Sequence, residues 1–281
     1  MQSFVSPSPA TIDVRELIIG SGPFGPNEVR AIADSLGTNA DTHRELRLTV
    51  QELQQVSDLS PAASVRLGVA LYLLGRSSEA VVSLKSGDGS ALALFALGLA
   101  QAALAAADEA CASFDAARTA GYPAGACLAA QANTLRAANR LEEAVAKLIN
   151  ATDEEKTSAE YLAAQGAIAV ERGDSVTDTL NILEKAVESD SGQPLALFCL
   201  GVLHDRIGND DEAIDCYQRS LLRYPATVGA LMNLGLLYED RDDFSQAQQC
   251  YRRILDGLPI DAPGREAVSY THLRAHETPC H

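Results

Sequence analysis

The feature that most constrains the fold of this chain is a set of small and apolar residues that recurs every 34 positions. The clearest two units lie in the C-terminal third, where six residues of one unit match six of the next. They are Leu197, Leu200, Gly201, Ala213, Tyr217 and Pro225, followed by Leu231, Leu234, Gly235, Ala247, Tyr251 and Pro259. A fixed period of this length indicates an array in which each unit packs only on its neighbours.

The same spacing extends toward the N-terminus with two irregularities. The segment 128–132 returns 34 residues later as 162–166, whereas Gly166 and Gly201 are 35 apart. Gly68 and Gly98 are only 30 apart, which indicates that the second helix of the first unit is shorter by about one turn. We predict six helical hairpins within residues 61–261.

This unit resembles the tetratricopeptide repeat (TPR), a helix–turn–helix of the same length. The resemblance implies an all-α fold: a right-handed superhelical solenoid of about six hairpins over residues 61–261, with an N-terminal helical cap over residues 1–60. Small residues such as Gly201 and Ala213 would let paired helices approach, which offsets the roughly 1 kcal/mol that glycine costs inside a helix. Tyr217 and its counterparts are expected to fill the gap between one hairpin and the next.

The N-terminal segment reads as three short elements. We predict a short helix over Ile12–Ile19, a helix over Asn27–Leu36 that starts with Pro26 in its first turn, and a helix from Asp41 to about Val56. The intervening Gly20–Gly25 fits the letters G-x-G-x-x-G of dinucleotide-binding folds. We interpret it as a helix-breaking loop, because the preceding segment is too charged for a buried strand and no strand–helix–strand units follow.

The C-terminal segment 262–281 is interpreted as a truncated end. Within it, residues 268–281 break the Ala/Leu pattern and resemble the translation of a common transposase sequencing adapter. We therefore treat 268–281 as an artefact and exclude its three histidines and Cys280 from any metal site. On this interpretation the natural protein continues beyond about Glu266.

Composition limits the partners. The chain has 22 Lys and Arg against 38 Asp and Glu, a formal net charge of −16, which predicts no direct binding of nucleic acid and favours solubility or basic partners. The longest apolar stretch, Ala91–Ala107, is slightly short for a membrane span and contains Gln101. We expect no membrane association and a cytoplasmic location, and the six cysteines show no zinc or redox spacing.

No set of side chains points to chemistry. Outside the tail the only histidines are His43 and His204, and we find no nucleophile triad, metal spacing or phosphate-binding loop. We predict no enzymatic activity, no catalytic residue, no metal site and no cofactor within these residues.

The resemblance implies a protein or peptide partner held along the concave side, which the first helices line. Helical spacing selects the residues of each first helix that face away from the second helix. They are Val65, Val69 and Tyr72; Phe95, Leu99 and Ala102; Ala129, Asn133 and Arg136; Ala163, Ala167 and Val170; Phe198, Val202 and Asp205; and Met232, Leu236 and Glu239.

This predicted groove is mostly apolar, which fits the apolar face of an amphipathic helix, either from a partner or from this protein's own missing C-terminal part. The family's clamp for peptide carboxylates needs Lys, Arg and Asn from adjacent first helices, and here only Asn133 and Arg136 could contribute, with Asn233 alone further on. We therefore predict a protein–protein interaction scaffold without that clamp. The alternative that these residues only pack the superhelix stays open.

Two further hypotheses concern residues that are absent. The Ile12–Leu36 segment with this style of repeat loosely resembles bacterial proteins in which such an array precedes a domain like the C-terminal domain of the RNA polymerase α subunit. The chain would then be the TPR arm of a larger transcription-associated protein. In the other hypothesis the array regulates an enzyme domain in the lost segment.

Overall fold

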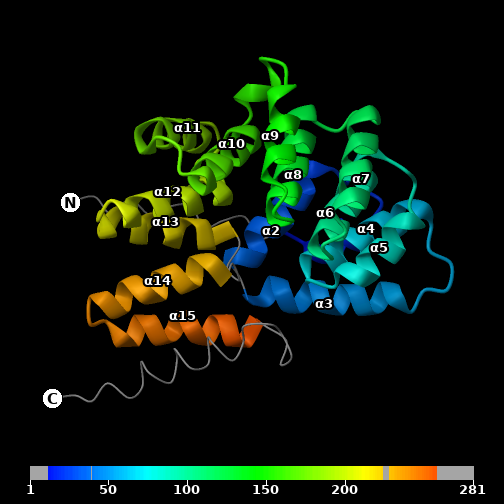
Figure 1. Ribbon diagram of the computed structural model, residues 1–281. Coiled ribbons are helices and arrows are strands. Elements are labelled where there is room, and N and C mark those ends of the chain that lie inside the picture. The colour runs from blue at the N-terminus through cyan, green and yellow to red at the C-terminus, as the bar shows by residue number, and fades with distance from the viewer. Residues whose placement is uncertain (1–11, 39, 224–227, 258–281) are drawn as a thin grey trace, which may run out of the picture.

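The computed structural model describes residues 12–38, 40–223 and 228–257 (Figure 1). These residues form fifteen α-helices and one short 3₁₀ helix, and they contain no strand. The all-α prediction is confirmed. Pro225, Pro259 and the segment 262–281, including the adapter-like residues, lie outside the described residues.

Six helical hairpins follow one another between Pro61 and Gly257, as the spacing predicts. The pairs are α4 (Pro61–Leu73) with α5 (Ser77–Lys85), α6 (Ala91–Ala103) with α7 (Ala107–Thr119), α8 (Ala124–Ala137) with α9 (Leu141–Ile149), α10 (Ala159–Arg172) with α11 (Val176–Ser189), α12 (Pro194–Arg206) with α13 (Asp210–Arg223), and α14 (Val228–Asp240) with α15 (Phe244–Gly257). The 3₁₀ helix Glu155–Thr157 precedes α10.

The turn inside each hairpin contains one residue with left-handed backbone geometry. The spacing between these residues follows the spacing of the repeat. They are Gly75, Ala105, Asn139, Gly173, Gly208 and Asp242. Their spacings of 30, 34, 34, 35 and 34 match those of the glycine signature. α5 has 9 residues against 14 in α13, as the short first unit predicts; α9 also has 9, but the 3₁₀ helix follows it and its unit keeps the normal length.

A large side chain of the second helix lies over the small residue of the first helix in each strong unit. A Cβ on Gly201 would approach the Tyr217 ring to 2.6 Å, and one on Gly235 would approach the Tyr251 ring to the same distance. No side chain fits there without a shift, which explains glycine in a helix interior. Tyr217 also reaches the next hairpin, because its hydroxyl accepts a hydrogen bond from Asn233 at 3.0 Å. The ring therefore packs both within and between hairpins.

Neighbouring first helices contact one another along most of the array: α4 with α6, α6 with α8, α8 with α10, and α10 with α12. Among the described residues no consecutive second helices contact each other as extensively. The first helices therefore line the shorter, inner arc of the array.

The N-terminal segment forms α1 (Val14–Ile19), α2 (Pro26–Thr38) and α3 (Ala40–Gln54). The Gly20–Gly25 segment follows a helix, not a strand, and it separates α1 from α2. Both α1 and α3 pack on α4, whereas α2 packs on α13 near the other end of the array. Figure 1 shows α2, in blue, near the middle of the molecule beside the C-terminal hairpins. The segment thus reaches well beyond the end that it was predicted to cap.

Candidate partner-binding groove

The predicted groove is covered in the first hairpin. Val65 is 4% exposed and Val69 is 1% exposed, and both belong to the buried cluster that contains Val14 and Ile18 of α1. Tyr72 is half-buried against the same cluster. Val65 and Val69 are therefore removed from the candidate site, because a helix from outside the repeats packs over their hairpin.

In the second hairpin the predicted residues pack against the following unit. The Phe95 ring stacks on Tyr122, which lies just before α8, with ring centroids 4.0 Å apart. Leu99 and Ala102 pack in the cluster formed around Phe114. Burial raises the pKa of Tyr122 to about 12, so this tyrosine is neutral at physiological pH. These half-buried side chains join two hairpins.

The middle of the inner arc is closed by small residues and one ion pair. Ala129, Ala163, Ala167 and Val170 are buried; Asn133 is half-buried. The Arg136 guanidinium is paired with Glu171 of α10, so it does not stand ready to bind a peptide carboxylate.

The open part of the predicted face lies on α12 and α14. Phe198 and Val202 are half-buried and contact the clusters on both sides of α12. Met232 is half-buried, and Leu236 on the next first helix is 45% exposed. We call this face the C-terminal groove and define it by the following residues: Phe198, Val202, Asp205, Met232, Leu236 and Glu239.

The end of the C-terminal groove nearest the hairpin turns is acidic. Burial, together with the negative charges of Asp210 and Asp240, raises the pKa of Asp205 above its usual range. Of the cations close by, Arg241 pairs with Asp210 at 3.8 Å and with Asp211 at 2.6 Å, while Arg206 donates to the Val170 carbonyl and only partly offsets the shift. A positive charge placed between Asp205 and Asp240 would relieve this repulsion.

A second hollow, which sequence reasoning did not single out, lies on the second-helix side between α11 and α13. It has a volume of about 710 Å³ and is open to solvent. Its lining includes five acidic residues: Glu184, Glu188, Asp211, Glu212 and Asp215. Leu200 and His204 of α12 also line it, and its acidic residues fall outside the set of residues that repeats every 34 positions.

The described residues offer neither a metal site nor a membrane span. They contain no group of three or more His, Cys, Asp or Glu side chains placed to hold an ion. None of their helices combines the length and apolar character needed to cross a bilayer.

Two family models, both described as tetratricopeptide repeat, match residues 194–227 and 230–266. These ranges coincide with the two units that carry the strongest signature, and their described parts are the hairpins α12–α13 and α14–α15. The chain contains tetratricopeptide repeats. Repeats of this family act in protein–protein interaction, and the looser resemblance to transcription-associated proteins stays a prediction.

Solved structures support the same fold over most of the TPR chain. A chain of the APC/C hetero-tetramer Cut9–Hcn1 matches with a TM-score of 0.57 and 15% identity, over 89% of this chain and 48% of that one. A tetratricopeptide repeat protein from Parabacteroides merdae matches with a TM-score of 0.57 and 11% identity, over 89% of this chain and 100% of that one. A monomeric IFIT1 mutant with Gppp-AAAA matches with a TM-score of 0.58 and 13% identity, over 86% of this chain and 62% of that one.

The TPR chain thus spans about half of the Cut9–Hcn1 chain that it matches. At these identities the likeness concerns the fold alone. No curated protein matches the chain.

Proposed function

We propose that this TPR protein is an interaction scaffold that holds an amphipathic polypeptide segment in the C-terminal groove, with the basic residues of that segment facing Asp205 and Glu239. The observation that carries the proposal is the exposure of Leu236, one helical turn after Met232, on a helix whose core also packs Phe198 and Val202. Single exposed leucines are common on protein surfaces. Here the leucine continues a half-buried apolar strip that runs across two first helices.

Charge decides which amphipathic segment fits. The formal net charge of the chain is −16, and Asp205 and Asp240 repel each other at the rim of the strip. A segment with Leu on one face and Lys on its flanks would bury apolar area on Leu236 and relieve that repulsion. An acidic segment with the same apolar pattern would add to the repulsion. The proposal therefore predicts that binding depends on the sign of the charge that flanks the apolar residues of the segment.

The test uses two synthetic helical peptides with the same apolar pattern, one flanked by Lys and the other by Glu. Binding to the full chain is followed by isothermal titration calorimetry at low salt. We expect the Lys peptide to bind and Leu236→Gln to weaken its affinity by about tenfold, the scale set by the transfer of one leucine side chain. The Glu peptide should show no measurable binding.

Leu104 provides a matched control, because it is 46% exposed, close to the 45% of Leu236, yet lies in the turn between α6 and α7. Leu104→Gln should leave the affinity of the Lys peptide unchanged. The proposal fails if neither peptide binds, if the Glu peptide binds as well as the Lys peptide, or if Leu104→Gln weakens binding as much as Leu236→Gln.

A further inference from the structure

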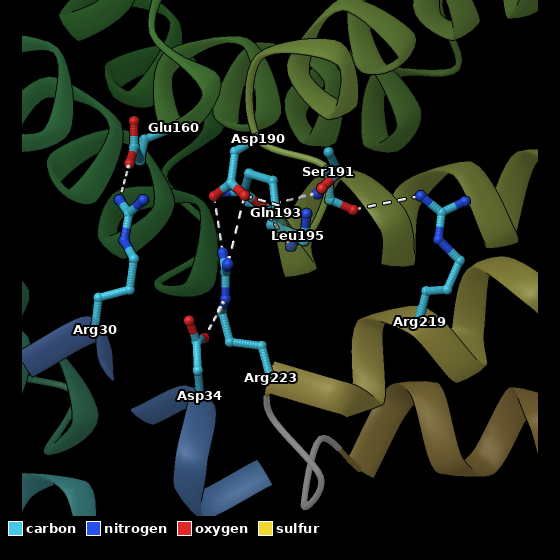
Figure 2. A network of polar contacts seen from close by, with 11 residues as sticks. Arg30, Asp34, Glu160, Asp190, Ser191, Gln193, Leu195, Arg219 and Arg223 are labelled. Carbon is cyan, nitrogen blue, oxygen red and sulfur yellow. Dashed lines mark hydrogen bonds and ion pairs between the residues drawn. The ribbon is translucent and has the colours of Figure 1, made fainter. Parts of the chain in front are cut away.

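An ion pair connects two parts of the chain that are 189 residues apart. The Arg223 guanidinium, at the end of α13, donates from Nε to Asp34 Oδ1 of α2 at 2.6 Å. The same guanidinium donates from Nη1 to Asp190 Oδ2 at 2.8 Å, just before α12. Figure 2 shows Arg223 between these two carboxylates. One arginine of the fifth hairpin thus binds both α2 and the loop that precedes α12.

A second ion pair, one helical turn away, attaches α2 to the fourth hairpin. Arg30 Nη2 lies 3.3 Å from Glu160 Oε1, in the first turn of α10 (Figure 2). Between the two pairs, Ile32 is fully buried and Ala33 nearly so. The charges at two turns of α2 therefore contact hairpins four and five, whereas its apolar face, with Ile32, packs on the buried cluster formed with α1, α3 and α4.

The Arg223 site is built into the local structure. Its side chain is only 18% exposed. A Cβ on Gly192 would come within 2.8 Å of Arg223 Nη2, so the glycine leaves room for the guanidinium. Burial opposes the charge of Asp190, yet hydrogen bonds from Arg223 and from the Gly192 N–H hold its pKa below the usual range. Arg223, Asp190 and Gly192 thus form a complete set of contacts within the array, and Asp34 of α2 adds a second carboxylate to Arg223.

Such a contact has a particular consequence in a repeat array. Each hairpin packs only on its neighbours, so small changes of angle add up along the array and its curvature is soft. α1 and α3 attach the N-terminal segment to the first hairpin, while α2 attaches it to the fourth and fifth. The segment therefore spans non-adjacent hairpins and restrains the curvature between them.

We propose that α2 is a releasable strap that fixes the curvature of the array through Asp34–Arg223 and Arg30–Glu160. The strap holds mainly through charges that solvent reaches: the side chains of Arg30 and Asp34 are 53% and 45% exposed. Salt weakens such pairs, because the Debye length falls to about 3 Å at 1 M. Release leaves the six hairpins folded and lets the array open.

The strap can be tested without any partner. The double variant Arg30→Gln/Asp34→Asn removes the α2 charge of each pair and leaves Arg223–Asp190 in place. Hydrogen exchange measured by mass spectrometry should show α2 amides exchanging about tenfold faster, while amides of α6–α11 are unchanged. Small-angle X-ray scattering should show a larger radius of gyration. Raising the salt to about 1 M should speed α2 exchange in the unmodified chain in the same way.

The matched control removes a comparable pair within the N-terminal segment. Arg15 and Glu52 join α1 to α3 at 2.8 Å, with both side chains about half exposed. Arg15→Gln/Glu52→Gln should change neither the α2 exchange rate nor the radius of gyration. A charge swap adds a second arm: Arg30→Glu alone should speed α2 exchange, and adding Glu160→Arg should restore it.

The strap is overturned if Arg30→Gln/Asp34→Asn leaves both readouts at their original values, if the control variant moves them equally, or if the swap gives no recovery. An effect of the strap on the affinity of the C-terminal groove would rest on the proposed function. Because neither readout uses a peptide, failure of the Lys peptide to bind leaves the test of the strap intact.

Discussion

Val69 and Leu236 occupy the same position on the first helices of the first and sixth hairpins, and their surroundings differ completely. Val69 is 1% exposed, in a cluster with α1, whereas Leu236 is 45% exposed. The repeat sets the direction of both side chains identically. What differs is whether a helix from outside the repeats packs there. In this repeat protein, the position within the unit therefore gives the face, and packing by additional helices or by neighbouring first helices decides whether that face is free.

The largest expected effect breaks this comparison directly. Val69→Asp would place an unpaired charge in the core and should lower the free energy of unfolding by about 3–5 kcal/mol. Leu236→Asp, at the matching position, should change it by less than about 1 kcal/mol, because the new carboxylate stays in water. Urea denaturation followed by circular dichroism measures both. Equal losses in the two variants would contradict the difference in exposure.

A second prediction concerns how the covered end is held. Arg66 on α4 donates to the backbone carbonyls of Leu17 and Gly22, and its guanidinium lies 4.9 Å from the centroid of the Phe24 ring. Hydrogen bonds to charged groups contribute about 1.5–3 kcal/mol, so Arg66→Ala should cost about 2–3 kcal/mol in urea denaturation.

The control for Arg66 is Arg206, an exposed arginine on the open side that donates to the Val170 carbonyl at 3.2 Å. Arg206→Ala should cost less than about 1 kcal/mol, since solvent replaces an exposed hydrogen bond. If Arg66→Ala were no more harmful than Arg206→Ala, the attachment of the N-terminal segment to α4 would be wrong.

A third prediction concerns the left-handed turn residue, which every hairpin of the array shares. Ala105 adopts the left-handed backbone of its turn, with φ of 58°, as Gly75 does in the first hairpin. That geometry costs a non-glycine residue about 1–2 kcal/mol, which exceeds the roughly 0.4–1 kcal/mol of unfolded-state entropy that glycine adds. Ala105→Gly should raise the thermal midpoint by a few degrees. Ala112→Gly, at an exposed position inside α7, should lower it.

The smallest expected effect is electrostatic and belongs to the open groove. The pKa of Asp205 is raised in the folded chain by burial and by Asp210 and Asp240. The folded state therefore binds the proton more tightly than the unfolded state, and the ionised carboxylate lowers stability as pH rises through the folded pKa. Asp205→Asn should raise stability at pH 7 by a few tenths of a kcal/mol, roughly the scale of surface charges.

Below the ordinary pKa of an aspartate the Asp205→Asn gain should disappear, because Asp205 is then protonated in both states. Chemical denaturation at pH 3 and pH 7 gives the comparison. A gain of the same size at both pH values would show that the effect is not the charge of Asp205.

Most of the repeat architecture could be predicted from the sequence, because it depends on residues close in the chain. A glycine under a tyrosine ring, as in Gly201 and Tyr217, requires two helices of one hairpin to approach. The 30-residue spacing between Gly68 and Gly98 predicted the short α5. Hairpins form from residues close in sequence, and the spacing of their signature residues recurs from unit to unit. The face of each first helix follows from the same helical spacing.

Only the tertiary structure decided which part of that face is open and where α2 goes. The burial of Val65 and Val69 results from α1, and the Arg223–Asp34 pair joins residues that no repeat relates. Neither contact leaves a periodic signal, because each occurs once, between a segment outside the repeats and a hairpin within them. Local packing sets the array, whereas single long-range contacts set its curvature and its free surface.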